Sequence, residues 1–288
     1  MMAILIDGKK LAKQVNQQTT ARAAGLIEKG VKPGIAVVLV GDDPASQIYT
    51  RNKHRLAVRM GLKSDLYRFP TDVKQSTVLG TIKELNNDDS IDAIIVQEPL
   101  PDHLDAVAIT NAISPAKDVD GLHPANLGKL FSNQPGHYPV ACTPRGIMRI
   151  FSYYQVPLTG ANVVIVGRSI LVGKPLLALL ANANATVTIA GRHTTNLREL
   201  TSQADILIVA TGIAHFIGKD DVKPGAVVID VGMDRLPSGK LTGDVDFAAV
   251  EPVAKMITPV PGGVGPMTIA SLMEQTVDLA EWRRNGQK

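Results

Sequence analysis

The sequence predicts an α/β protein of two domains, each built on a mostly parallel sheet. Three observations support this prediction. The chain has 288 residues, well above the roughly 150 residues of an average domain. Its hydrophobic fraction is 45%, yet it has only 5 Phe, 5 Tyr and 1 Trp, so Val, Ile, Leu and Ala must form most of the core. Short runs of these residues alternate with longer segments of helical period, a pattern typical of parallel strands covered by helices.

The first part of the chain shows this alternation clearly. The predicted elements, in chain order, are a helix over 8–28, a strand over 34–40, a helix over 44–60, a more exposed strand over 64–69, a helix over 73–86 and a strand over 91–96. The helix over 44–60 has recognisable ends, because Asp43 and Pro44 are typical of a helix start and Gly61 of a helix end.

The periodicity fades over 99–143, where Pro, Asp, His, Asn and Gly prevail. A segment of this length without regular elements usually forms a binding loop or a connection between domains. The alternation then resumes with apolar runs that predict strands over 162–166, 185–190, 206–210 and 226–231. A last helix is predicted over 267–284, and because no strand follows it, we expect it to pack back onto the first domain. The predicted domains are residues 1–140 completed by 267–288, and residues 141–266.

Composition and charge argue against several classes of protein. The chain has 30 basic and 27 acidic residues, a net charge of +3, with no long basic run and few aromatics, so nucleic acid is not an expected partner. The single cysteine, Cys142, cannot form an internal disulfide, and the six histidines show no metal-ligand spacing. We therefore expect a reducing, cytoplasmic setting and no metal. The apolar stretch 3–6 is too short for a secretion signal, and no later segment is long enough to cross a membrane, so a membrane partner is not expected either.

Residues 162–175 form a candidate nucleotide site. They run from a buried strand through a glycine-bounded turn into an apolar helix, which presents a helix N-terminus to a phosphate group. The spacing fits neither the usual dinucleotide fingerprint nor a P-loop, since five residues separate Gly167 from Gly173 and Pro175 stands where Ser or Thr would bind magnesium. The residues alone fit a tight packing turn equally well.

The next strand bears on which dinucleotide is bound. The segment after it, from Gly191, has no acidic residue of the kind that binds the ribose 2′-hydroxyl of NAD. Arg168 and Arg192 can both approach a 2′-phosphate, which favours NADP. The alternative interpretation is that both arginines are solvated loop residues.

Four further segments are candidates for a substrate site. Tyr49 and Lys53 share one face of a predicted helix, although an exposed pair would have the same spacing. Gln97 follows a buried strand, at the edge where open α/β sheets bind ligands. Asp120 lies in the long irregular segment, where an ordinary Asp/Gly turn is the alternative. The Pro/Gly loop 258–266 is rigid, and its backbone can approach a ligand closely.

Together these segments resemble the bifunctional methylenetetrahydrofolate dehydrogenase/cyclohydrolase family over nearly the whole chain. The matching motifs, in order, are Tyr49-x-x-x-Lys53, VQEPLP at 96–101, KDVDG at 117–121, CTPRGI at 142–147, GRSILVGKP at 167–175, KPGAVVIDVG at 223–232, GDVDF at 243–247 and TPVPGGVGPMT at 258–268. The resemblance implies an N-terminal folate-binding domain completed by the C-terminal helix, a Rossmann-like NADP domain, an active-site cleft between them, and a homodimer.

The resemblance also implies two reactions and the residues that serve them. A hydride passes from 5,10-methylenetetrahydrofolate to NADP, and water then opens the methenyl product to 10-formyltetrahydrofolate. Lys53 would be the proton-transfer group of the second step, oriented by Gln97. Tyr49 would stack on the folate, and Asp120 would accept hydrogen bonds from the pterin.

Other site residues follow from the same resemblance. Further substrate contacts would come from Leu100, Pro261, Gly262 and Gly263. Cofactor contacts would come from Gly167, Arg168, Ser169, Gly173, Pro175, Arg192, Thr211, Gly212, Val231 and Gly232. Three alternatives to the bifunctional enzyme are a dehydrogenase without the hydrolytic step, a non-catalytic dinucleotide-binding regulatory protein, and a hydroxy-acid or shikimate-type dehydrogenase, which would need its own catalytic base.

Glu98 departs from the family pattern, which usually has Leu at this place. A carboxylate within ~4–6 Å of Lys53 would favour the charged form of the lysine. Side chains alternate along a strand, and Pro99 favours an extended backbone at Glu98, so we expect the strand to continue and Glu98 to face away from Lys53.

Overall fold

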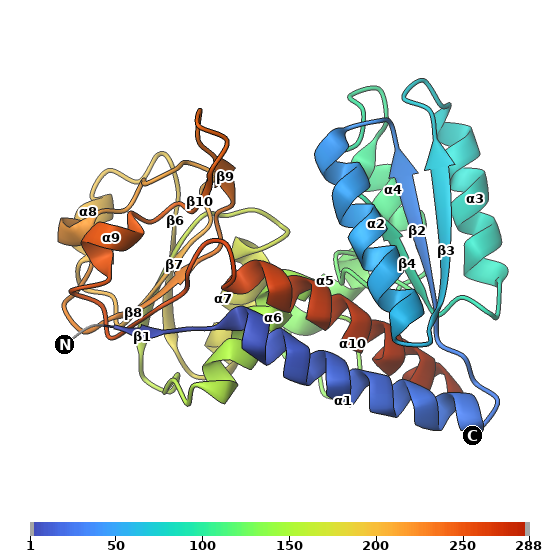
Figure 1. Ribbon diagram of the computed structural model, residues 1–288, viewed down its shortest axis with the longest axis horizontal. Helices are drawn as coiled ribbons and strands as arrows, with labels where there is room; N and C mark the ends of the chain where they lie inside the picture. The colour runs from blue at the N-terminus through green and yellow to red at the C-terminus, as the bar shows by residue number, and fades with distance from the viewer. Residues whose placement is uncertain (1–2, 286–288) are drawn as a thin grey trace. The chain divides into compact units, whose positions relative to one another are not determined.

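The computed structural model describes residues 3–285, and the chain divides into two compact units (Figure 1). The first unit contains the chain up to Lys13 together with Thr143–Ala270. The second contains Gln14–Cys142 and the chain from Ser271 onward. Each unit has a parallel sheet with helices around it, which confirms the predicted α/β class.

Two long helices contribute residues to both units: α1 (Gly8–Glu28) and α10 (Val264–Asn285). The N-terminal residues of α1 group with the first unit, although the sequence analysis assigned all of 1–140 to the other domain. Residues 1–2, at the start of that predicted domain, and 286–288, at the end of the predicted C-terminal segment, lie outside the described residues.

The second unit contains a three-stranded parallel sheet in the order β3-β2-β4. After α1 its elements are β2 (Gly34–Val40), α2 (Pro44–Arg59), β3 (Lys63–Phe69), α3 (Gln75–Asn87), β4 (Ala93–Val96), α4 (Ala106–Ala112) and α5 (Pro124–Phe131). Every residue of β2 is buried, since apolar side chains pack against both of its faces. Ala36 and Val38 share a core cluster with residues of α3 and α4, whereas Ile35 and Val37 share one with residues of α1, α2 and α10. Burial on both faces explains why the apolar run is uninterrupted.

Residues 99–143 are more regular than predicted, because α4 and α5 lie within them. Each helix begins at a side-chain cap: the carboxylate of Asp105 accepts hydrogen bonds from Val107 and Ala108, and the ring of His123 accepts one from Ala125. The two helices have 7 and 8 residues, too few for a helical period to stand out in the sequence. Between them, the amide of Ile94 in β4 donates to the carbonyl of Lys117 at 2.7 Å, so the chain leading to Asp120 runs beside β4.

The first unit contains a six-stranded parallel sheet in the order β1-β11-β8-β7-β5-β6. Its strands are β1 (Ile4–Leu5), β5 (Asn162–Val166), β6 (Thr186–Ala190), β7 (Ile206–Val209), β8 (Val227–Asp230) and β11 (Met256–Ile257), and β9 (Asp234–Arg235) and β10 (Leu241–Thr242) form a separate antiparallel pair. Its helices other than α1 and α10 are α6 (Cys142–Tyr153), α7 (Gly173–Asn182), α8 (Leu197–Thr201) and α9 (Phe247–Val250), with a 3-10 turn over Lys219–Asp221. β5 to β8 match the predicted strands within a few residues.

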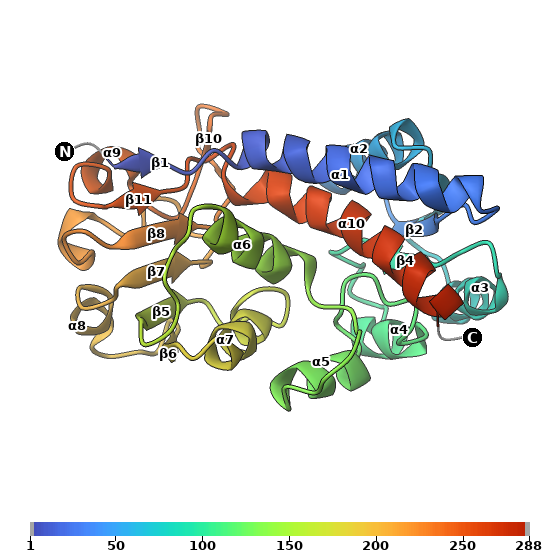
Figure 2. The ribbon, with the colours of Figure 1, turned by 90° about the horizontal axis from the view of Figure 1, so that it is seen from below.

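The first unit has the topology that places ligands at one edge of its sheet. Figure 2 shows α6 and α7 on one face of this sheet and α8 on the other. β5 pairs with β6 on one side and with β7 on the other, although the chain runs from β5 to β6 and then to β7. The strand order therefore reverses at β5, and ligands of open α/β sheets bind beyond the carboxyl ends of the strands at such a point.

Helix α10 is a central part of the core of the second unit. All of its residues from Ser271 to Ala280 are buried, and Leu272, Met273 and Val277 share a core cluster with Ile35 of β2. Its polar side pairs with α1, where the guanidinium of Arg22 lies 2.6 Å from Asp278 and 2.7 Å from Glu281.

We expect Met273→Ala to lower the free energy of unfolding by about 2–5 kcal/mol, because a fully buried side chain is replaced by a cavity. Arg284→Ala, at an exposed position of the same helix, should change it by less than about 0.5 kcal/mol. Urea unfolding followed by circular dichroism measures both. Equal stabilities for the two variants would show that α10 is not part of the core.

Candidate functional site

The turn after β5 lies at the reversal of strand order in the first unit. Gly167 has φ +129°, and a Cβ there would lie 2.2 Å from the carbonyl oxygen of Ala210, which follows β7. A Cβ on Gly173, the first residue of α7, would lie 1.9 Å from the carbonyl oxygen of Gly167. Both positions therefore require glycine. The closed turn brings the N-terminus of α7, with Pro175 buried in its first turn, to the carboxyl edge of the sheet.

Two arginines, Arg168 and Arg192, lie at the same edge of the sheet. The stem of Arg168 lies against Gly191, where a Cβ would be 3.4 Å from the Cδ atom of the arginine. The neighbouring Arg192 is exposed, and its Nε atom donates to Nε2 of His193 at 3.1 Å. The two arginines follow adjacent strands, β5 and β6. Ser169, between Arg168 and α7, accepts a hydrogen bond from the amide of Val172 at 3.2 Å.

Asp244 connects the loops after β7 and β8. Its carboxylate accepts hydrogen bonds from the amides of Thr211, Gly212 and Ile213, the last two at 3.2 Å. A Cβ on Gly232 would lie 2.2 Å from the same carboxylate. Asp244 belongs to the motif at 243–247, but the sequence predicts no role for it, because its partners are backbone amides distant in sequence.

Two further carboxylates surround Asp244. Asp230 accepts hydrogen bonds from the amides of Gly232, Asp244 and Val245, each at 3.0 Å, and burial raises its pKa to about 7. Burial and a hydrogen bond to Asp244 raise the pKa of Asp234 to about 6. The nearby negative charge of Asp244 contributes to this rise in the pKa of Asp234.

In the second unit, a lysine of α2 is bonded to the end of β4. The carboxylate of Asp43 caps α2 by accepting from the amide of Ser46 at 2.7 Å. Further along α2, Nζ of Lys53 donates to Oε1 of Gln97 at 2.9 Å. Gln97 comes directly after β4, and its backbone amide donates to the carbonyl of Val38 at 2.8 Å. Lys53 and Gln97 are both half-buried, as is Tyr49, whose pKa is raised by burial.

Asp120 belongs to the same group of residues. It is half-buried, and burial raises the pKa of its carboxyl group, while the nearby charge of Lys53 lowers it. The thiol of Cys142 is a hydrogen-bond partner of this carboxylate. Asp118 pairs in parallel with Ile94, so Asp120 lies beside Val96, the last residue of β4. Gln97 is the next residue along the chain.

The expected extension of the strand through Glu98 is wrong, because β4 ends at Val96. The exposed carboxylate of Glu98 instead turns forward and accepts a hydrogen bond from the amide of Leu100 at 3.2 Å. Glu98 and Lys53 both lie within the described residues, and they form no ion pair with each other. The position of Glu98 is therefore set by this turn and not by strand alternation, and its orientation away from Lys53 stays a prediction.

The three remaining predicted substrate residues belong to the first unit. The amide of Lys9 donates to the carbonyl of Gly262 at 3.1 Å, and the amide of Gly263 donates to the carbonyl of Pro259 at 2.8 Å. These bonds hold Pro261–Gly263 against the start of α1. A substrate contact from this loop stays a prediction.

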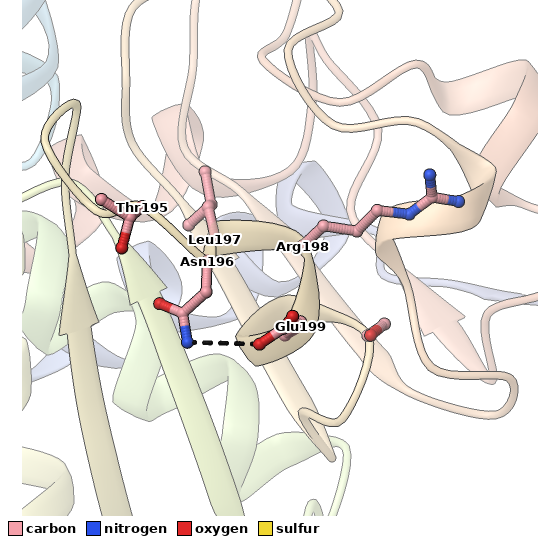
Figure 3. Close-up of a pocket in the computed structure, with 6 residues that line it drawn as sticks. Thr195, Asn196, Leu197, Arg198 and Glu199 are labelled. Atoms are coloured by element: carbon pink, nitrogen blue, oxygen red, sulfur yellow. Dashed lines mark hydrogen bonds between the residues drawn. The ribbon is translucent and has the colours of Figure 1, made fainter.

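Two surface pockets lie away from these residues. Figure 3 shows one of about 400 Å³ around the start of α8, lined by Thr195, Asn196, Leu197, Arg198, Glu199 and Ser202. The amide of Asn196 donates to Glu199 across it at 3.4 Å. A second pocket, of about 370 Å³, lies in the second unit beside Trp282. Neither contains a predicted site residue.

Two features are absent from residues 3–285. No group of three or more His, Cys, Asp or Glu side chains there is arranged to hold a metal ion. No helix within this range has the length and apolar character needed to cross a membrane.

Comparison with known proteins gives matches along the whole chain. The catalytic domain of tetrahydrofolate dehydrogenase/cyclohydrolase matches residues 6–120, and the NAD(P)-binding domain of the same proteins matches residues 141–284. The bifunctional protein FolD of Limosilactobacillus reuteri is 66% identical, over 99% of this chain and 100% of that protein.

Solved structures give the same result. The FolD methylenetetrahydrofolate dehydrogenase/cyclohydrolase of Campylobacter jejuni is 43% identical, with a TM-score of 0.96 over 98% of this chain and 99% of that one. The Trypanosoma brucei enzyme, solved with NADP and an inhibitor, is 34% identical, with a TM-score of 0.95 over 99% of both chains.

We expect Gly173→Ala to lower the free energy of unfolding by at least about 2 kcal/mol, because its Cβ would overlap the backbone of Gly167. The matched control is Gly80→Ala in α3, where a Cβ would meet nothing within 4 Å. That variant should be slightly more stable, since Ala favours a helix over Gly by ~1 kcal/mol. A Gly173→Ala protein as stable as the Gly80→Ala protein would contradict the closed turn.

Proposed function

The chain belongs to the tetrahydrofolate dehydrogenase/cyclohydrolase family, and from this premise we propose which side chains carry its two reactions. The protein is a bifunctional enzyme. It oxidises 5,10-methylenetetrahydrofolate to the methenyl compound with NADP and hydrolyses that compound to 10-formyltetrahydrofolate. The hydrogen bond from Lys53 to Gln97, beside Asp120, is the observation that carries the assignment.

We propose that the first unit holds NADP at the reversal of its strand order. The residues fit a dinucleotide, because the glycines at 167 and 173 bring a helix N-terminus to the sheet edge and two arginines lie beside it. Gly167, Arg168, Ser169, Gly173 and Pro175 would hold phosphate groups. Arg192 would bind the 2′-phosphate. Thr211, Gly212, Val231 and Gly232 would contact the rest of the cofactor, which accepts a hydride when bound.

We propose that the second unit binds the folate and moves the protons of the hydrolytic step. Attack of water on a methenyl cation requires a group that accepts a proton. Lys53 suits this role, because an amine can accept and release a proton. Oε1 of Gln97 holds Nζ in place. Tyr49 would stack on the folate, Leu100 would add an apolar contact, and Asp120 would accept hydrogen bonds from the pterin.

This arrangement also bears on the alternative functions. A protein that only senses a dinucleotide has no use for a lysine bonded to a glutamine at the end of β4 in the other unit. A dehydrogenase without the hydrolytic step would not need a proton-transfer group there either. The Lys53–Gln97 pair therefore favours the bifunctional enzyme.

We further propose that the protein acts on tetrahydrofolate derivatives as a cytoplasmic homodimer, with neither nucleic acid nor a membrane as partner. A net charge of +3 and a single cysteine are consistent with this setting. The homodimer follows from the family resemblance.

We expect Lys53→Met to lower the rate of methenyltetrahydrofolate hydrolysis by ~10²-fold or more, because the side chain keeps its length but loses the proton-transfer group. The dehydrogenase rate should fall less. Arg55→Met, an exposed change on the same helix, is the control and should leave both rates unchanged. Hydrolysis is followed spectrophotometrically without any nicotinamide cofactor. Near-normal hydrolysis by the Lys53→Met protein would remove Lys53 from this role.

We expect Arg192→Ala to weaken NADP binding by roughly 10- to 150-fold and to leave NAD binding nearly unchanged, because a charge-assisted contact to the 2′-phosphate is lost. Arg198→Ala is the matched control, since that arginine pairs with Asp220 at 3.1 Å and should affect neither cofactor. Calorimetric titration with each dinucleotide measures both affinities. An equal loss for NADP and NAD would mean that Arg192 supports the loop without reading the phosphate.

A further inference from the structure

Gln275 of α10 joins two backbone segments next to Asp120. Its side chain is fully buried in the second unit. The Nε2 atom donates to the carbonyl of Val119 at 2.5 Å and to the carbonyl of Val140 at 2.8 Å. The Oε1 atom accepts from the amide of Val140 at 3.1 Å. One amide group therefore ties together the segments on either side of α5.

These two segments touch directly beyond Asp120. Gly121 has φ +65°, and a Cβ there would lie 2.5 Å from the carbonyl carbon of Val140. Cys142, two residues after Val140, places its thiol 3.3 Å from the carbonyl of Val119 and also within hydrogen-bond reach of the Asp120 carboxylate. The position of this carboxylate thus depends on how closely the two segments are held.

We propose that Gln275 is a positioning residue for Asp120, holding Val119 and Val140 at the spacing at which the carboxylate can bind the substrate. This inference rests on the proposed role of Asp120. Gln275 fits the task because an amide offers two donors and an acceptor, and it uses both kinds here. A carboxylate lacks the donors, and an apolar side chain would leave buried carbonyl and amide groups without partners.

The surroundings of Gln275 argue against a role in helix packing alone. Its neighbours on α10 include Leu272 and Val277, which belong to an apolar core cluster, and the buried polar residues Glu274 and Thr276. Burying an amide in such a place costs free energy unless the amide is hydrogen-bonded. The three bonds described above go to the segments beside Asp120, and Nε2 also donates at 3.9 Å to Sγ of Cys142, whose thiol is a hydrogen-bond partner of the Asp120 carboxylate.

The test compares Gln275→Met with Asp120→Asn and with Thr276→Val. Met keeps the volume of Gln and makes none of the three bonds. Thr276 is also fully buried, but its hydroxyl donates within α10 to Leu272 at 2.8 Å, so its loss should not reach Asp120. For Gln275→Met we expect the KM for the folate substrate to rise by about tenfold or more in both reactions, because misplacing a binding group weakens its contact. The KM for NADP should stay within about twofold.

Each result decides between the proposals. A folate KM that is normal in Gln275→Met but raised in Asp120→Asn overturns the positioning role and leaves the role of Asp120 intact. If Gln275→Met lowers the melting temperature but leaves the folate KM unchanged, the positioning role is also overturned. Thr276→Val is the control, because it shows how far the loss of a buried hydrogen bond elsewhere in α10 lowers the melting temperature. A normal KM in Asp120→Asn overturns both proposals. If Gln275→Met does not fold, Gln275→Asn replaces it, because that side chain keeps the amide but is too short to bridge both segments; the same KM comparison then applies.

Discussion

Apolar residues on both faces of the central strands constrain where this protein can place polar groups. A strand such as β2, buried along its whole length, has no face on which a charged side chain can meet a substrate. The carboxyl ends of the strands are the remaining places, and the candidate residues gather there. Gln97 follows β4 in the second unit, and Gly167 follows β5 in the first. The chemistry of each unit is then set by the side chains that neighbouring helices and loops bring to that edge.

The same constraint explains what could be predicted from sequence. β2, β5, β7 and β8 were predictable because strands buried on both faces are nearly unbroken apolar runs. β1 and β11 were not, since a strand of two residues has no period. The pairing of Lys53 with Gln97 came from a family resemblance, and spacing alone would also fit an exposed lysine. Asp244 and Gln275 could not be assigned, because their partners are backbone groups that only the folded chain brings near.

Backbone groups do much of the positioning in both units. In the first, Asp244 binds successive amides of the loop after β7, and Asp230 binds one amide after β8 and two after β10. In the second, Gln275 gathers groups of Val119 and Val140. Each of these side chains is almost completely buried. Loops are thus held by buried polar side chains that bind their backbone groups from beneath.

The pairing of β1 with β11 has a consequence for the order in which the protein forms during translation. Ile4 and Leu5 are synthesised long before their partners, Met256 and Ile257, because the whole of the second unit's sheet and most of the first unit's sheet lie between them in the sequence. The core of the second unit also waits for α10. Neither unit can therefore be completed before β11 and α10 are synthesised. The apolar strands that are made earlier must be kept from unproductive association until then.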